Sequence, residues 1–311
     1  MKIGVIILYE LKLMLRNRVE LILLLTLPVA MIALMGYAMK PLLNLQATDP
    51  QAAPAAYAQS VGKEISGSLE ASVRAAAEKR GVTEEGLATV LAAVKPAETA
   101  IRINAIPIKE SSQPAINSFQ FFGAGMLIFF LMTCGLGLGN NIINERSDRV
   151  FYRIISFPVT HNQYLAGKAA GNALIGLVQA ASIILFTSLA FDIGWGSDYF
   201  GLILVVLMLM LITSGLAVTV SSLLNSSKSL TMLLTVLYWI MAFISGSFAP
   251  LPIFKPIAGY IPNNWAFQVL TGMMAGTGLA QLINYVLYLL AFGLVFWTAG
   301  VMLYRRRVSN E

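Results

Sequence analysis

The chain has 311 residues, of which 57% are hydrophobic and 12% charged, and its formal net charge at pH 7 is +6. Soluble domains carry about 25% charged residues, so this composition excludes an ordinary soluble enzyme or binding module. The Lys and Arg residues lie in short segments beside apolar stretches rather than in one patch. That distribution is typical of membrane topology and argues against nucleic-acid binding.

Six apolar stretches contain no Asp, Glu, Lys, Arg or His. A helix needs about 20 apolar residues to cross a bilayer core of roughly 30 Å, and each stretch is long enough. The sequence therefore predicts an all-α polytopic membrane protein with about six transmembrane helices. Because the stretches lack the ionisable groups that ion-driven carriers place at mid-membrane, energy for any transport is expected from another chain. The stretches cover residues 21–39, 117–143, 169–191, 199–224, 230–249 and 279–304.

Residues 1–19 are predicted to form a cytoplasmic interfacial helix before transmembrane helix 1, which covers residues 20–40. Their apolar side chains recur at helical spacing, and most of the charged ones, Glu10 included, are expected on other sides of the helix. An N-terminal extension of the first span is the alternative. The apolar positions are Ile3, Ile6, Ile7, Leu11, Met14 and Leu15.

Residues 41–115 are expected to form a small α+β external domain. The composition changes here to Ala, Glu, Lys, Pro and Gln, and two segments have the apolar spacing of amphipathic helices. Alternation of apolar and polar residues at 101–104 predicts a short edge strand, which Pro107 limits. A disordered loop is the alternative interpretation.

A cytoplasmic hairpin at residues 144–168 is predicted between transmembrane helices 2 and 3. Glu145 and Arg149 are spaced to pair on one helix, which also has an apolar side. Pro158 ends this helix, and Thr160 begins the next one with a capping-box pattern. We expect a stiff hairpin that docks a partner; a simple connector is the alternative. The apolar side consists of Val150, Phe151, Ile154 and Ile155.

Transmembrane helices 2–6 are assigned to residues 116–304, with a re-entrant segment at the outer interface at residues 250–278. In this segment Pro and Gly interrupt the helix repeatedly, yet the sequence stays apolar. Trp265 and Tyr260 fit the aromatic belt of a membrane interface. Residues 305–311 are predicted to form a cytoplasmic tail.

The positive charges predict the orientation in the membrane. Lys and Arg are found before the first span, in the 144–168 hairpin and after the last span. The loop between spans 3 and 4 contains Asp192 and Asp198 but no Lys or Arg. Because positive residues are retained in the cytoplasm, both termini are expected there.

The sequence lacks the motifs of a nucleotide or metal site, and its other polar and small residues within the spans are explained by helix packing. There is no GxxxxGK[ST] phosphate loop, and His161 is the only histidine, so a paired-histidine metal site is impossible. We predict no catalytic residue and no metal site, and we assign no substrate-binding residue. Packing or hydrogen bonding between helices is the preferred role of Cys134, Gly135, Gly137, Gly139, Asn140, Asn141 and Gln179.

The chain resembles the ABC-2 permeases, the membrane subunits of type 2 ABC exporters, in the subgroup with an external domain after the first span. The resemblance covers nearly the full length and centres on Glu145-Arg146, Pro158 and Gly167-Lys168. The family often has Gly-Thr-Leu/Ile where this chain has Arg149-Val150-Phe151. The segment before the last span also matches, at Ser245-Gly246-Ser247-Phe248-Ala249-Pro250 and Ile261-Pro262.

The resemblance implies a transporter of two permease chains, identical or homologous, and two ABC ATPase subunits in the bacterial cell (inner) membrane. ATP and Mg would be bound by the ATPase subunits and no cofactor by this chain. The hairpin would be the coupling helix. An amphiphilic drug, antibiotic or lipid-like cargo is favoured; sodium extrusion and a non-transport envelope or sensor role are the alternatives. The implied coupling residues are Glu145, Arg146, Asp148, Arg149 and Pro158.

Overall fold

The computed structural model divides the chain into two compact units, Met1–Ala38 with Pro114–Glu311, and Met39–Gln113. The second unit, with the expected external domain, lies outside the described residues, as does Pro158. All described helices therefore belong to the first unit. The structure describes residues 2–16, 22, 26–38, 116–156, 159–248 and 252–310.

Every regular element among the described residues is helical, which confirms an all-α polytopic membrane protein. Five helices are long and apolar enough to span a membrane: α6, α8, α9, α10 and the segment Leu279–Ser309. The first predicted span is described only as an apolar helix over Thr26–Ala38, so this span stays a prediction. The elements are α1 (Lys2–Arg16), α6 (Ser118–Ser147), α7 (Val150–Ile155), α8 (His161–Phe191), α9 (Tyr199–Leu223), α10 (Ser227–Ile244), η1 (Pro252–Phe254), α11 (Lys255–Ala258), α12 (Pro262–Met274), η2 (Leu279–Leu282) and α13 (Ile283–Asn310).

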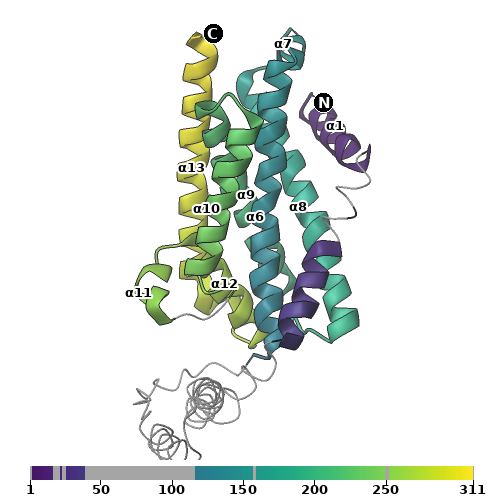
Figure 1. Cartoon of the computed structure of the whole chain (residues 1–311), viewed down its shortest axis with the longest axis vertical. Coiled ribbons are helices and arrows are strands. Elements are labelled where there is room, and N and C mark those ends of the chain that lie inside the picture. Colours follow the sequence, from purple (N-terminus) through teal and green to yellow (C-terminus); the bar gives the residue numbers. More distant parts are fainter. Residues whose placement is uncertain are drawn as a thin grey trace, which may run out of the picture. The chain divides into compact units, whose positions relative to one another are not determined.

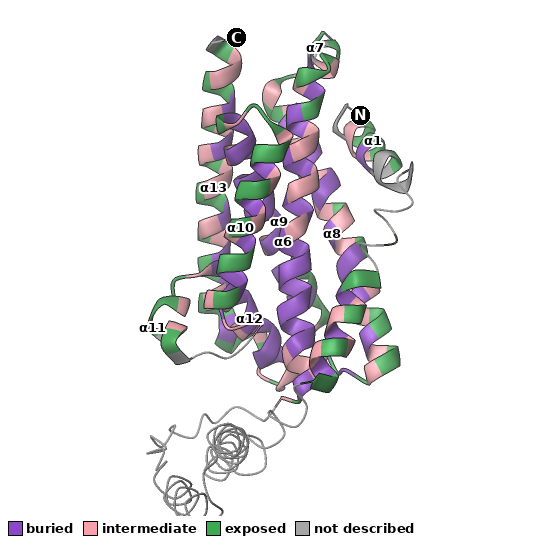
Figure 2. Ribbon diagram, viewed as in Figure 1, coloured by how far each residue is buried: buried purple, intermediate pink, exposed green. Residues whose placement is uncertain are grey.

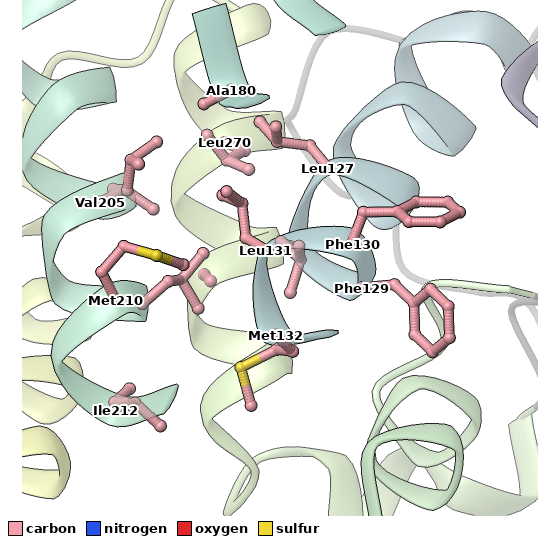
Figure 3. Close-up of a cluster of buried hydrophobic side chains, with 14 of the residues drawn as sticks. Leu127, Phe129, Phe130, Leu131, Met132, Ala180, Val205, Met210, Ile212 and Leu270 are labelled. Atoms are coloured by element: carbon pink, nitrogen blue, oxygen red, sulfur yellow. The ribbon is translucent and has the colours of Figure 1, made fainter. Parts of the chain in front are cut away.

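Helices α6 and α9 form the centre of the bundle (Figures 1 and 2). In its most apolar segment α6 is 78% buried and α9 67%, whereas α8, α10 and α13 reach only 28%, 28% and 22%. The outer helices therefore expose apolar side chains, as a lipid environment requires. Figure 3 shows the core, in which side chains of α6 meet those of α8, α9 and α12. The labelled side chains are Leu127, Phe129, Phe130, Leu131, Met132, Ala180, Val205, Met210, Ile212 and Leu270.

Small residues allow the central helices to approach closely, as predicted. A Cβ added at Gly135 would lie 2.6 Å from the Tyr238 hydroxyl, and one at Gly139 would lie 2.8 Å from a Leu230 methyl carbon. Gly137 differs, because a Cβ there would meet nothing within 4 Å. Helices in lipid are held together largely by such close contacts, since hydrophobic burial provides no driving force there.

Polar side chains inside the bundle form hydrogen bonds between helices, as expected. The amide Nδ2 of Asn140 lies 3.0 Å from Oγ1 of Thr231. Cys134 is buried, and its Sγ lies 2.8 Å from Oε1 of Gln179 on α8. These contacts connect α6 to α10 and to α8 through polar groups that lipid could not satisfy.

The segment before the last span folds into short helices at the opposite end of the bundle from α7 (Figure 1). Helix α12 packs against α6, α9 and α13, and most of its apolar residues are buried. The indole Nε1 of Trp265 donates to the Gly259 carbonyl at 2.7 Å. The irregular backbone before α12 is less enclosed, since Ile253, Ile257 and Tyr260 are 77%, 54% and 79% exposed.

Helix α1, helix α7 and the C-terminal end of α13 lie at one end of the bundle (Figure 1). Phe151 of α7 and Tyr304 of α13 are in contact, with ring centroids 6.0 Å apart. The two ends of the described chain therefore share one side, as the charge pattern predicted. That this side is cytoplasmic stays a prediction.

Candidate functional site

A buried charge network joins three helices at the end of the bundle that carries α7. The ammonium group of Lys168 on α8 donates to the carboxylates of Glu10 on α1 and Glu145 on α6. Lys168 is 1% exposed, Glu10 4% and Glu145 7%. Charged side chains are almost never buried unless they are paired, and here each carboxylate shares the same cation.

Both carboxylates of this network have a second donor. Nδ2 of Asn141 lies 3.2 Å from Oε2 of Glu10, and the Tyr164 hydroxyl donates to Oε2 of Glu145 at 2.7 Å. The Lys168 ammonium lies 5.6 Å from the Tyr164 ring centroid, within the range of a cation–π contact. Every charged group of the network is thereby paired and hydrogen-bonded.

Losing any one member of this network would destabilise the protein. Removing one partner of a buried ion pair costs about 3–5 kcal/mol, because an uncompensated charge is left in apolar surroundings. Two carboxylates share one ammonium, so the donors from Asn141 and Tyr164 are needed to stabilise the second negative charge. The network therefore acts as one unit.

Two glycines of α8 allow α1 to reach the network. A Cβ added at Gly167 would lie 3.0 Å from the Cβ of Ile6, and one at Gly171 would lie 2.9 Å from the Cβ of Glu10. Larger residues at either position would push α1 away. The Gly167-Lys168 pair of the sequence thus provides both the close approach and the cation.

Arg146 points in a different direction from Glu145, since neighbouring residues on a helix are about 100° apart. Its Nη2 donates to the Ser221 carbonyl at 2.8 Å. Arg307 of α13 donates from Nη1 to the carbonyls of Ser222 and Leu224 at 2.7 and 3.1 Å. Two arginines therefore satisfy the C-terminal carbonyls of α9, where the helix dipole favours positive charge.

Helix α7 is anchored to this end of the bundle by Phe151, which is 1% exposed. Its ring packs against Tyr164 with centroids 5.3 Å apart and against Tyr304 at 6.0 Å. The capping box predicted at Thr160 is present: Gln163 N donates to Thr160 Oγ1, and Thr160 N donates to Gln163 Oε1. A short helix is present where one was predicted, but it covers only Val150–Ile155, and its Phe151 packs on aromatic side chains of the protein.

Comparison with known proteins identifies the family. Residues 43–302 match the sequence profile of the ABC-2 family transporter proteins. The chain belongs to the ABC-2 family. This confirms the resemblance seen in the sequence. The proteins of this family are transporter proteins.

One curated relative is the linearmycin resistance permease protein LnrN of Bacillus subtilis (strain 168), which is 25% identical over 183 residues. The match covers 57% of this permease and 47% of LnrN. The chain thus spans about half the length of the curated relative that it matches.

The structure corrects the predicted pairing of Glu145 with Arg149 in this permease. Helix α6 ends at Ser147, and Arg149 adopts a left-handed backbone conformation with φ of 59°, so the two residues do not share a helix. Glu145 is paired with Lys168 instead, and Arg149 is exposed. The buried cation is the stronger partner because no water competes for the carboxylate.

The predicted coupling residues fall into two groups. Asp148 and Arg149 are exposed at the hairpin tip, whereas Glu145 and Arg146 face the bundle. The expectation that Glu10 avoids the packed side of α1 was wrong, because Glu10 is buried against α8. Its spacing of three and four residues from Ile7 and Ile6 was the available signal.

Proposed function

We propose that this permease is the membrane subunit of an ATP-driven exporter and that the hairpin at residues 144–168 receives the motion of the ATPase. One observation carries the proposal: the hairpin presents exposed charged side chains in the turn before α7 and on α7, a helix that is anchored by Phe151. Asp148, Arg149 and Arg153 are exposed, while Phe151 between them is buried. A protruding tip with a fixed base can transmit a displacement to the bundle.

In this proposal the four described coupling residues act in different ways. Asp148 and Arg149 contact the ATPase. Glu145 and Arg146 act through other side chains, since they hold the base of the hairpin to α8 and to α9. Pro158 stays a proposed end of the short helix, as expected from the sequence.

The favoured cargo is an amphiphilic molecule such as an antibiotic or a lipid-like compound. Two features support it: the spans are almost devoid of charge, and the relative LnrN is named for resistance to linearmycin. The assembly would contain two permease chains, identical or homologous, and two ABC ATPase subunits that bind ATP and Mg. It would lie in the bacterial cell membrane with both termini in the cytoplasm.

The test is transport by inside-out proteoliposomes that contain the permease with its ABC ATPase. ATP-dependent uptake of linearmycin is the expected result, with no uptake when the ATPase is omitted or when a proton or sodium gradient replaces ATP. ATP-dependent uptake of ²²Na⁺ without uptake of linearmycin would replace the proposed cargo by sodium. Transport without the ATPase would overturn the proposed energy source.

A further inference from the structure

Helix α1 is attached to the base of the hairpin through Glu10, a residue without a role in the function proposed above. We propose that Glu10, Lys168 and Glu145 form a permanent joint, which makes α1 move together with the hairpin. Glu10 is then a positioning residue for coupling. The inference rests on the proposed function, because it specifies where the motion received by the hairpin is delivered.

The charge network is complete only while α1 stays on α8. Lys168 bridges the two carboxylates, and Asn141 and Tyr164 complete their hydrogen bonds; Lys168, Glu10, Glu145 and Tyr164 are buried. Separating α1 from α8 would leave Glu10 without its cation and Lys168 with only one of its two carboxylates. Because that loss would recur in every transport cycle, a joint that stays closed is favoured over one that opens.

The two sides of α1 differ in their contacts. The side that carries Ile6 and Glu10 is closely packed on Gly167 and Gly171. The other side exposes Val5 and Leu8, at 63% and 67%. Helix α8 is the principal neighbour of α1 among the described elements, so the joint is its main attachment to the bundle.

The helix after α1 among the described residues, Thr26–Ala38, offers a receiver for the motion of α1. It packs at its far end against α6 and α8, where Tyr37 lies 5.0 Å from Phe119 and 6.4 Å from Phe191 between ring centroids. Because this helix follows α1 in the chain, a displacement of α1 would act on its N-terminal end, and so on the first predicted span. The joint provides a route from the hairpin to that span which does not pass through the bundle core.

Arg146 provides a separate connection. It holds α6 to the Ser221 carbonyl at the end of α9, and Arg307 holds α13 to the neighbouring carbonyls of Ser222 and Leu224. Adjacent residues of the Glu145-Arg146 pair thus connect the hairpin to two different sets of helices. Loss of the Glu10 contact should consequently uncouple α1 while the attachment to α9 and α13 remains.

The first experiment compares Glu10→Gln with Lys12→Gln, an exposed position on the same helix. Both variants are purified with the ABC ATPase and assayed for ATP-driven linearmycin uptake. We expect Glu10→Gln to retain ATPase co-purification and basal ATP hydrolysis and to lose at least tenfold in uptake, with Lys12→Gln within twofold of wild type. Normal uptake by Glu10→Gln, or loss of its ATPase co-purification, would overturn the proposed joint.

The second experiment locks α1 onto α8 and does not depend on the stability of Glu10→Gln. The variant Ile6→Cys with Gly167→Cys is made in a Cys134→Ser background. Ile6→Cys removes the Ile6 carbons beyond Cβ that a side chain at position 167 would meet, and the remaining Cβ–Cβ distance of 3.0 Å has to widen only to the usual disulfide separation of about 3.8 Å. The oxidised pair should transport normally in the otherwise wild-type chain and should restore uptake to Glu10→Gln, and a reductant should reverse the restoration. Loss of uptake on oxidation, with recovery on reduction, would show that α1 must separate and would overturn the joint. If wild-type permease shows no ATP-driven transport, the proposed function fails instead.

Discussion

The Tyr164 hydroxyl donates a hydrogen bond to the Glu145 carboxylate, with 2.7 Å between Oη and Oε2. Tyr164 lies near the start of α8 and Glu145 near the end of α6, so this contact ties together the two helices that flank α7. Tyr164 also packs against Phe151 of α7. One side chain therefore connects the charge network to the aromatic anchor of the hairpin.

Replacing Glu145 with Ala should destabilise the protein by about 3–5 kcal/mol, because it removes one of the two carboxylates that share Lys168. Thermal unfolding in detergent measures the effect as a lower midpoint. Asp148→Ala is the control: it removes an exposed carboxylate at the hairpin tip and should change stability by no more than about 0.5 kcal/mol. Equal midpoints for the two variants would contradict the buried network.

Replacing Arg149 with Glu should leave folding intact and weaken binding of the ATPase. The side chain is exposed, so its reversal of charge acts mainly on a partner. We expect the affinity for the ATPase to fall about tenfold or more, equivalent to about 1.4 kcal/mol, in a pull-down titration. Arg306→Glu makes the same charge change on an exposed residue near the end of α13 and should bind normally. Equal loss in both variants would indicate a nonspecific charge effect.

Cysteines introduced at Ser147 and Ser197 should be labelled from opposite sides of the membrane. Both positions are exposed, one at the end of α6 and the other in the loop between α8 and α9. An impermeant thiol reagent added to intact cells should label position 197 and leave 147 unlabelled until the membrane is opened. The reverse pattern would place the termini outside and refute the orientation inferred from positive charges.

Gly135→Ala and Gly137→Ala form a matched pair on α6. The new methyl at 135 would lie 2.6 Å from the Tyr238 hydroxyl and 3.1 Å from the Thr213 carbonyl, whereas the one at 137 would meet nothing within 4 Å. We expect a loss of about 1–3 kcal/mol at position 135 from overpacking. At position 137 we expect no loss, or a gain of up to about 1 kcal/mol from the higher helix propensity of Ala. Thermal unfolding distinguishes them; equal effects would argue against the close packing of α6 with α10.

The sequence determined the helical elements because the signals for them are local. The bounds of α9, Tyr199–Leu223, differ by one residue from the predicted stretch 199–224. The capping box at Thr160 was also readable, since its partners are three residues apart. Span length, capping and helix-breaking residues each depend on neighbours in the chain, so they can be recognised in a single sequence.

Only the tertiary structure decided which charges are paired. From the sequence, Lys168 was a loop cation and Glu145 a partner of Arg149. In the fold, Glu10 reaches Lys168 across 158 positions of the chain, and Glu145 reaches it across 23. A pairing of this kind depends on the approach of α1 to two glycines of α8 and on the exclusion of water, neither of which local spacing encodes.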